Sequence, residues 1–199
     1  MKVKSLFTIF LSYLSFTCAI EERNYTENNL LTTSTCVCTT VPCPVVGANY
    51  LSIGGGGTGT YYYDLHNNIP VVKSASVRLT INNMDKGTDT TSCTQSYSRS
   101  LDDDGIVNCD AGHILAHRLG GPGNQPINIF PQDLSVNRGA YAQYEDSIYT
   151  CITSKGSTIV DLYWIFYYSS TNKTKPNSVM YDVKYYDGTC VSTSKTFSN

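Results

Sequence analysis

Residues 109–145 bring together the side-chain types that activate water and hold a hard cation. The segment reads CDAGHILAHRLGGPGNQPINIFPQDLSVNRGAYAQYE and contains His113, Asn128, Asn137 and Glu145. A histidine with an ordinary pKa of about 6.5 can take a proton from water at neutral pH. Amide and carboxylate oxygens suit Mg²⁺, which keeps several of its waters, so one protein ligand can seat it. The pattern indicates general-base chemistry assisted by a divalent cation such as Mg²⁺ or Mn²⁺.

Each of these residues also has an ordinary structural explanation. His113 could bond only its neighbours in a turn, and Asn128 could cap a loop. Asn137 could be a polar residue early in a helix, and Glu145 could be a solvated helix residue. The pair Gly120-Gly121 is more typical of a tight backbone turn than of a ligand contact. Within the ordered set we interpret His113 as a base, whereas both explanations remain open for Asn128 and Glu145.

The order of these elements resembles the DNA/RNA non-specific endonucleases, which are ββα-metal or His-Me finger nucleases. The family motif is Asp-Arg-Gly-His, then Asn-x-x-Pro-Gln, then Asn-Gln/Arg-Gly with an aromatic residue two positions on and a Glu in the same helix. Here the elements are Asp-Ala-Gly-His at 110–113, Asn-Ile-Phe-Pro-Gln at 128–132, Asn-Arg-Gly at 137–139, Tyr141 and Glu145. Gly-Gly behind the histidine resembles a branch of secreted nucleases and toxin domains.

The resemblance implies that the chain hydrolyses phosphodiester bonds of DNA and/or RNA without strong sequence specificity. In that case His113 is the general base, and Asn137 is the ligand of a single Mg²⁺ or Mn²⁺ ion. Asn128 orients the histidine, and Glu145 holds a metal-bound water.

Ala111 is a departure from the family motif, because the arginine that lies near the phosphate in relatives is missing. Arg118, Arg138 and Arg99 are the arginines that could replace it. We choose Arg118, which resembles an arginine of the secreted-toxin branch, although a surface ion pair explains any of the three equally well.

The segments around this motif predict an α+β fold of one domain, residues 48–199, with antiparallel sheet(s) and a ββα-metal finger. Strands are expected at 61–65 (YYYDL) and 74–81 (SASVRLTI), after a glycine-rich turn. A turn at Asp104-Gly105 leads into a short strand that ends at the histidine.

The second half of the chain is expected to contain a helix and two further strands. The helix begins with Ser135 as its N-cap. The β-rich runs at 157–170 and 177–189 are expected to pair or to lie in one sheet.

The N-terminal residues indicate export. Residues 1–19 combine a basic start, a short apolar run and small residues before a cleavage point, which predicts a signal peptide rather than an anchor. A Thr/Cys-rich arm or linker is expected at 20–47. No later run is apolar enough to span a bilayer, so a secreted chain without a membrane anchor is predicted.

The cysteines are consistent with an oxidising compartment. Of eight, Cys18 leaves with the leader, and the odd remainder predicts disulfides plus one thiol that is free or pairs between chains. Cys109 is expected to fix its strand through a disulfide. Asn24 and Asn172 begin acceptor triplets for N-glycosylation.

The charge balance argues mildly against a simple nucleic-acid binder. After loss of Lys2 and Lys4 the chain has 12 basic against 16 acidic residues. A protein that holds nucleic acid by bulk electrostatics is normally basic. Two alternatives to an enzyme therefore stay open: a catalytically inactive extracellular binding module on the same fold, and an unrelated adhesive or structural domain. The sequence leaves the oligomeric state undetermined.

Overall fold

The computed structural model describes residues 38, 41–104 and 109–199. The predicted leader at 1–19 and the triplet at Asn24 lie outside the described residues. So do most of the expected arm at 20–47 and Gly105 of the expected turn.

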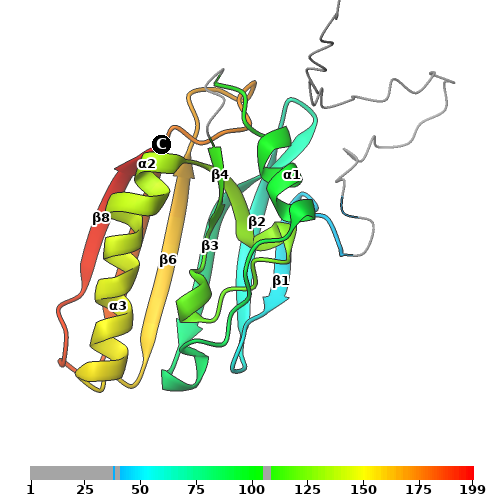
Figure 1. Ribbon diagram of the computed structural model, residues 1–199. Coiled ribbons are helices and arrows are strands. Elements are labelled where there is room, and N and C mark those ends of the chain that lie inside the picture. The colour runs from blue at the N-terminus through cyan, green and yellow to red at the C-terminus, as the bar shows by residue number, and fades with distance from the viewer. Residues whose placement is uncertain (1–37, 39–40, 105–108) are drawn as a thin grey trace, which may run out of the picture. The chain divides into compact units, whose positions relative to one another are not determined.

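A six-stranded antiparallel sheet forms the centre of the structure, with strand order β1-β2-β3-β6-β7-β8 (Figure 1). Its strands are β1 (Gly47–Ser52), β2 (Thr58–His66), β3 (Ile69–Leu79), β6 (Val160–Tyr167), β7 (Ser178–Tyr185) and β8 (Thr193–Ser198). The glycine-rich turn connects β1 to β2. The strand predicted at 61–65 is confirmed within β2. The strand predicted at 74–81 is confirmed as far as Leu79 of β3, whereas Ile81 already begins a 3₁₀ turn.

Alternation along β6 explains how the sheet acquires an apolar face. Val160, Leu162, Trp164 and Phe166 are buried, and the residues between them are partly or fully exposed. Strand β7 alternates in the same way and pairs with β6 in an antiparallel register that places Trp164 opposite Tyr181. The predicted pairing of the two C-terminal β-rich runs is confirmed.

A second, two-stranded sheet and the helix after it form the ββα unit. Strand β4 (Cys109–His113) pairs antiparallel with β5 (Ile129–Asp133). The chain then runs through α2 (Leu134–Val136), a π-helical segment η4 (Asn137–Tyr141) and α3 (Ala142–Ser154). Helix α3 lies across β6 and β8 in Figure 1, and Ile148 and Ile152 belong to the core that includes the sheet. The α+β fold with a ββα-metal finger is confirmed.

The start of this helix differs from the prediction. Asp133 is the N-cap and Leu134 the first helical residue, so Ser135 lies inside the first turn. The reason is that β5 runs directly into the helix and leaves no loop in which Ser135 could cap it. The helix is then kinked at Gly139, whose φ of −113° and ψ of −110° are not helical. Kinks commonly occur at glycine and at π-helical turns, which are frequent near functional sites.

Helix α1 (Ser92–Ser100) was not expected from the sequence. Thr91 caps it by accepting a hydrogen bond from the backbone N–H of Thr94 at 3.3 Å. Tyr97 and Leu101 pack with Ile129 in a small apolar cluster between α1 and the second sheet. Three short 3₁₀ turns complete the elements: η1 (Ile81–Asn83), η2 (His117–Leu119) and η3 (Pro126–Asn128).

Two disulfides join distant parts of the described chain, Cys38–Cys93 and Cys151–Cys190. Cys109 is free, so the bridge expected there is wrong. Its thiol interacts with Asp102 and Ser98 instead, and burial together with Asp102 raises its pKa to about 12. Within the described ranges, no helix combines the length and apolar character needed to cross a bilayer.

Candidate active site

The second sheet places His113 at the C-terminal end of β4. His113 is the last residue of this strand and lies opposite Ile129 of β5. Its imidazole Nε2 is 3.1 Å from the backbone carbonyl oxygen of Thr88. A carbonyl can only accept, so Nε2 carries the proton and Nδ1 of the neutral ring keeps a lone pair. Burial lowers the pKa of His113 below its ordinary 6.5, so the ring is neutral at pH 7.

The loop that holds His113 depends on a glycine. The Thr88 carbonyl accepts a second bond, at 2.9 Å, from the backbone N–H of Gly123. A Cβ atom on Gly123 would lie 2.4 Å from Nε2 of His113 and 2.6 Å from the Thr88 oxygen. Glycine therefore allows the loop to close against the imidazole and fix which nitrogen is protonated.

Gly120 and Gly121 have a structural role in the same loop. Gly120 has a φ of +98°, which favours glycine. A Cβ on Gly121 would lie 1.7 Å from the carbonyl oxygen of Leu115. The paired glycines allow close backbone approach, in agreement with their interpretation as a turn.

Asn128 lies beneath the site, with 0% of its surface exposed. Its amide accepts from Leu115 N at 2.9 Å and Tyr61 Oη at 3.0 Å, and donates to Leu115 O at 2.9 Å. Its own carbonyl accepts from Ile114 N at 2.8 Å. Asn128 therefore anchors the two residues that follow His113 rather than bonding the imidazole.

Asn137 begins the π-helical segment, and its amide has a defined orientation. Its Nδ2 donates to Oδ2 of Asp110 at 2.9 Å. Arg138 binds both oxygens of the same carboxylate, each at 2.9 Å. Burial would raise the pKa of Asp110, but the bonds from Arg138 and Asn137 outweigh it and lower that pKa. Because ionised Asp110 only accepts, the amide nitrogen faces it and the amide oxygen remains for another partner.

Glu145 contributes a carboxylate from the first turn of α3, and one oxygen of this half-buried side chain is fully buried. Its Oε1 has no hydrogen-bond partner among the described residues. Burial and the adjacent Asp146 raise the pKa of Glu145 well above its ordinary value. Orphaned polar atoms of this kind are rare in folded proteins, and an unfilled ion or water site is one explanation.

Two cavities meet at His113 and Asn137, because both residues line both spaces. The first cavity, of about 210 Å³, also has Glu145, Arg118 and His117 in its walls. The second, of about 490 Å³, extends from the same pair toward α1. Four of the five predicted site residues thus line the first cavity, and Asn128 supports it from below.

The residues present fit a single hydrated cation rather than a cage. Among the described residues no group of three or more His, Cys, Asp or Glu side chains is arranged to hold a metal. Asn137 and Glu145 line the same cavity, and each has a side-chain oxygen that no bond within the described residues occupies. One or two protein oxygens are enough for Mg²⁺, which retains its other waters.

The three candidate arginines differ in how their charge is used. Arg118 pairs with Asp146 and lies over the ring of Tyr149, 3.9 Å from its centroid. Arg138 is held by Asp110 as described above. Arg99, on α1, has only a 3.4 Å bond to the Ser96 hydroxyl in the described part of the chain.

Several residues of the site were missed in the sequence. Thr88 contributes a backbone oxygen, which leaves no side-chain signature. Asp89 lies 3.1 Å from Nδ1 of His117 at the edge of the cavities. Asp110 orients Asn137, a role that was not assigned to it from the sequence. The Asp-x-Gly-His motif was the available signal for Asp110, and no pattern pointed to Thr88 or Asp89.

Comparisons with known proteins identify the family and the fold. Residues 50–186 match the family model described as DNA/RNA non-specific endonuclease. Over 97 residues the chain is 40% identical to "Probable deoxyribonuclease RhsA" of Dickeya dadantii (strain 3937). That alignment covers 49% of this chain but 6% of the relative, so the chain spans only a small part of that protein.

Two solved structures resemble the fold. The Sda1 nuclease with bound zinc ion has a TM-score of 0.53 at 14% identity, covering 77% of this chain and 85% of that one. NucA from Streptococcus agalactiae with magnesium ion bound has a TM-score of 0.49 at 14% identity, covering 81% and 85%.

Proposed function

The chain belongs to the DNA/RNA non-specific endonuclease family, and from this premise we propose that it is an exported, divalent-metal-dependent endonuclease. It hydrolyses phosphodiester bonds of DNA and/or RNA without strong sequence specificity. The observation that carries the proposal is that a strand-end imidazole and a helix amide, His113 and Asn137, share the walls of both cavities.

His113 is the general base. Its Nδ1 takes a proton from the water that attacks phosphorus, and this group contributes about 10²- to 10⁴-fold to the rate. The Thr88 carbonyl, 3.1 Å from Nε2, stabilises the positive ring that results. Because burial keeps the ring neutral, the base is ready at neutral pH.

Asn137 and Glu145 are the residues that would hold the cation, Mg²⁺ or Mn²⁺. When bound, it would stabilise negative charge on the phosphate and on the departing 3′ oxygen. Asn137 offers its amide oxygen because Asp110 occupies the amide nitrogen. Glu145 offers the buried oxygen that lacks a partner and would hold a water of the ion.

Two predicted residues act around this centre. Asn128 is a positioning residue, since its bonds fix the backbone just after His113. Arg118 remains a candidate contact to the scissile phosphate, because it lies at the wall of the first cavity. Its ion pair with Asp146 must then be shared with the phosphate or broken.

Export is supported by the disulfides Cys38–Cys93 and Cys151–Cys190, which persist in oxidising compartments. In a secreting host the protein is expected in the medium, with an N-terminus at Ile20 after removal of residues 1–19. Retention in the cell with an intact N-terminus would contradict the proposal.

Cleavage assays test the enzymatic part of the proposal. The purified mature chain is incubated with plasmid DNA and with RNA in Mg²⁺, Mn²⁺ or EDTA. Cleavage that requires the metal and falls at least 100-fold in His113→Ala is expected. Cleavage unaffected by EDTA or by that substitution would remove the mechanism.

Binding without turnover in every metal would instead favour the inactive module. Ala111 is the observation behind that second candidate, because β4 carries no cation where the family motif has arginine.

A further inference from the structure

Beyond the walls that it shares with the smaller cavity at His113 and Asn137, the larger cavity has no binding role in the mechanism above. It extends from His113 and Asn137 toward α1, and its walls include Arg99 and Ala111. A nucleic-acid strand with one phosphate at the His113–Asn137 pair must continue on both sides of it. The second cavity, at about 490 Å³, is the larger space available for that continuation.

Arg99 supplies an uncompensated positive charge in this cavity. Arg138, also in its wall, is neutralised by two bonds to Asp110. The remaining carboxylate, Asp89, lies beside His117. Arg99 is exposed and, within the described ranges, no carboxylate pairs with it. A guanidinium without a carboxylate partner is well suited to bind a phosphate through two parallel hydrogen bonds.

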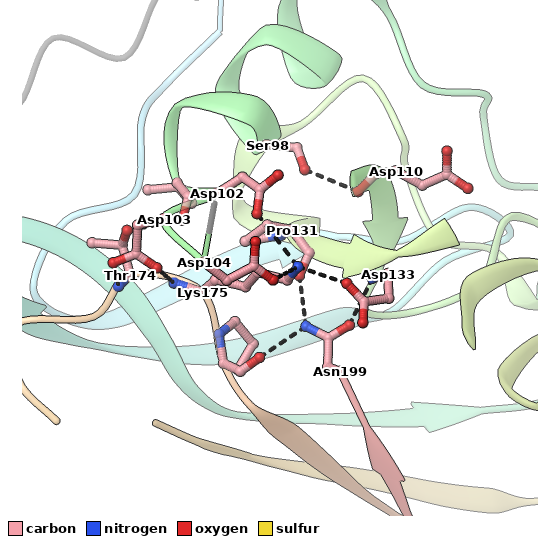
Figure 2. A network of polar contacts seen from close by, with 12 residues as sticks. Ser98, Asp102, Asp103, Asp104, Asp110, Pro131, Asp133, Thr174, Lys175 and Asn199 are labelled. Atoms are coloured by element: carbon pink, nitrogen blue, oxygen red, sulfur yellow. Dashed lines mark hydrogen bonds and ion pairs between the residues drawn. The ribbon is translucent and has the colours of Figure 1, made fainter. Parts of the chain in front are cut away.

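Helix α1 holds Arg99 at a fixed place relative to the catalytic strand. The adjacent Ser98 donates to the backbone oxygen of Asp110 at 3.0 Å, a bond drawn in Figure 2. The same hydroxyl lies 3.4 Å from the carbonyl oxygen of Phe130. The Cys38–Cys93 disulfide fastens the first turn of the helix. Binding at Arg99 therefore requires ordering of one side chain rather than of a loop.

Ala111 has a small side chain in the wall of the larger cavity. Ala111 lies on β4 between Asp110 and Gly112 and projects no charge of its own into the cavity. We propose that the cavity beside α1 is a second phosphate subsite, in which Arg99 binds the phosphate next to the one that is cleaved. This inference rests on the proposed function. It assigns to α1 an anion contact that β4 does not provide.

Salt-dependent DNA binding is the first test. The affinity of the His113→Ala protein for a DNA duplex is measured over a range of salt, with and without Arg99→Ala. Loss of one phosphate contact is expected to weaken binding roughly tenfold at low salt and to lower the slope of log K against log salt by about 0.9. Arg99→Lys should retain most of the slope. Lys73→Ala, which removes an exposed charge on β3, is the matched control.

Trinucleotides provide a sharper test with the active enzyme. One linkage is replaced by an uncharged methylphosphonate, so that only the other can be cleaved. When the neighbouring linkage on the Arg99 side is neutral, the kcat/KM of the wild type should be several-fold lower than with the unmodified trinucleotide. On that modified trinucleotide, Arg99→Ala should lower kcat/KM no further. The unmodified trinucleotide, whose neighbouring linkage keeps its charge, should remain sensitive to Arg99→Ala.

The outcomes separate this inference from the function on which it rests. Wild-type protein that cleaves no nucleic acid in any metal would overturn the proposed function. Wild-type cleavage with Arg99→Ala indistinguishable from Lys73→Ala in salt slope and in its response to the neutral linkage would overturn the subsite alone. Arg99 is exposed, so an unchanged Tm is expected to show that the variant is folded.

Discussion

Two clusters of charged and polar groups, one around Lys175 and one at the cavities, differ in how completely their groups are paired. Around Lys175, whose exposed fraction is 5%, the ammonium lies 2.5 Å from Asp104, 2.6 Å from Asp133 and 3.4 Å from Asp102 (Figure 2). Burial would lower the pKa of Lys175, but Asp104 and Asp133 raise it. This lysine stays charged and joins three segments of the chain.

The cluster at the cavities has the opposite character. Glu145 Oε1 is buried without a partner in the described part of the molecule. The amide oxygen of Asn137 faces away from Asp110, and Nδ1 of His113 keeps a lone pair. Paired charges around Lys175 stabilise the fold, whereas the unpaired groups at the cavities are left for a ligand. A buried oxygen without a hydrogen bond does not mark the functional site by itself, because Asp102 Oδ1 also lacks one. Asp102, however, lies 3.4 Å from the Lys175 ammonium, and no ion pair of Glu145 is found among the described residues.

Lys175→Met should give the largest effect on stability. Removing the ammonium takes the charge of Lys175 away from Asp102, Asp104 and Asp133, and breaking a buried ion pair costs about 3–5 kcal/mol. Chemical denaturation should show this loss in the free energy of unfolding. Lys73→Met, at an exposed position, should stay within about 0.5 kcal/mol of the wild type. Equal stability of the two variants would mean that the Lys175 cluster does not hold the fold.

Glu145→Gln should have the opposite effect to Lys175→Met, because it should lower cleavage and leave stability intact. Loss of the carboxylate that would hold a metal-bound water is expected to lower cleavage about 10- to 100-fold. Without divalent cations the free energy of unfolding should be unchanged or higher, because the substitution removes a buried charge that nothing neutralises. Asp64→Asn, on the exposed side of β2, is the control for loss of a carboxylate. If Glu145→Gln lowered the free energy of unfolding by several kcal/mol without loss of cleavage, Glu145 would have a structural role and no role in the reaction.

The pH dependence of cleavage should give the smallest effect, about tenfold in kcat/KM for each pH unit below the pKa of the base. Burial lowers the pKa of His113, and the base acts in its neutral form. Activity should therefore be level at neutral pH and fall as the pH drops through a midpoint below 6.5. A midpoint above 6.5, or the same acid limb in the residual activity of His113→Ala, would contradict the assignment.

Local patterns were sufficient to predict much of this fold. Strands β2, β3, β6 and β7 alternate apolar and polar residues. This alternation can be recognised within a few consecutive residues, without knowledge of distant contacts. The strand that ends at His113 and the helix that carries Asn137 were likewise predicted from their own residues.

Features that depend on distant contacts could not be predicted. Helix α1 has a polar sequence whose stability comes from packing on the second sheet, although its N-cap Thr91 was a readable signal. An odd number of cysteines indicates a free thiol but does not say that it is Cys109. The Thr88 carbonyl and the partners of Lys175 reach their places only through the tertiary fold.

The most direct measurement is a crystal structure of the His113→Ala protein with a short DNA and Mn²⁺, located by its anomalous signal. We expect the ion at the amide oxygen of Asn137, on the same phosphate that faces position 113, with Glu145 beside one of its waters. An ion bound elsewhere, or a phosphate that touches only one of positions 113 and 137, would contradict the proposal that the two residues act on one bond.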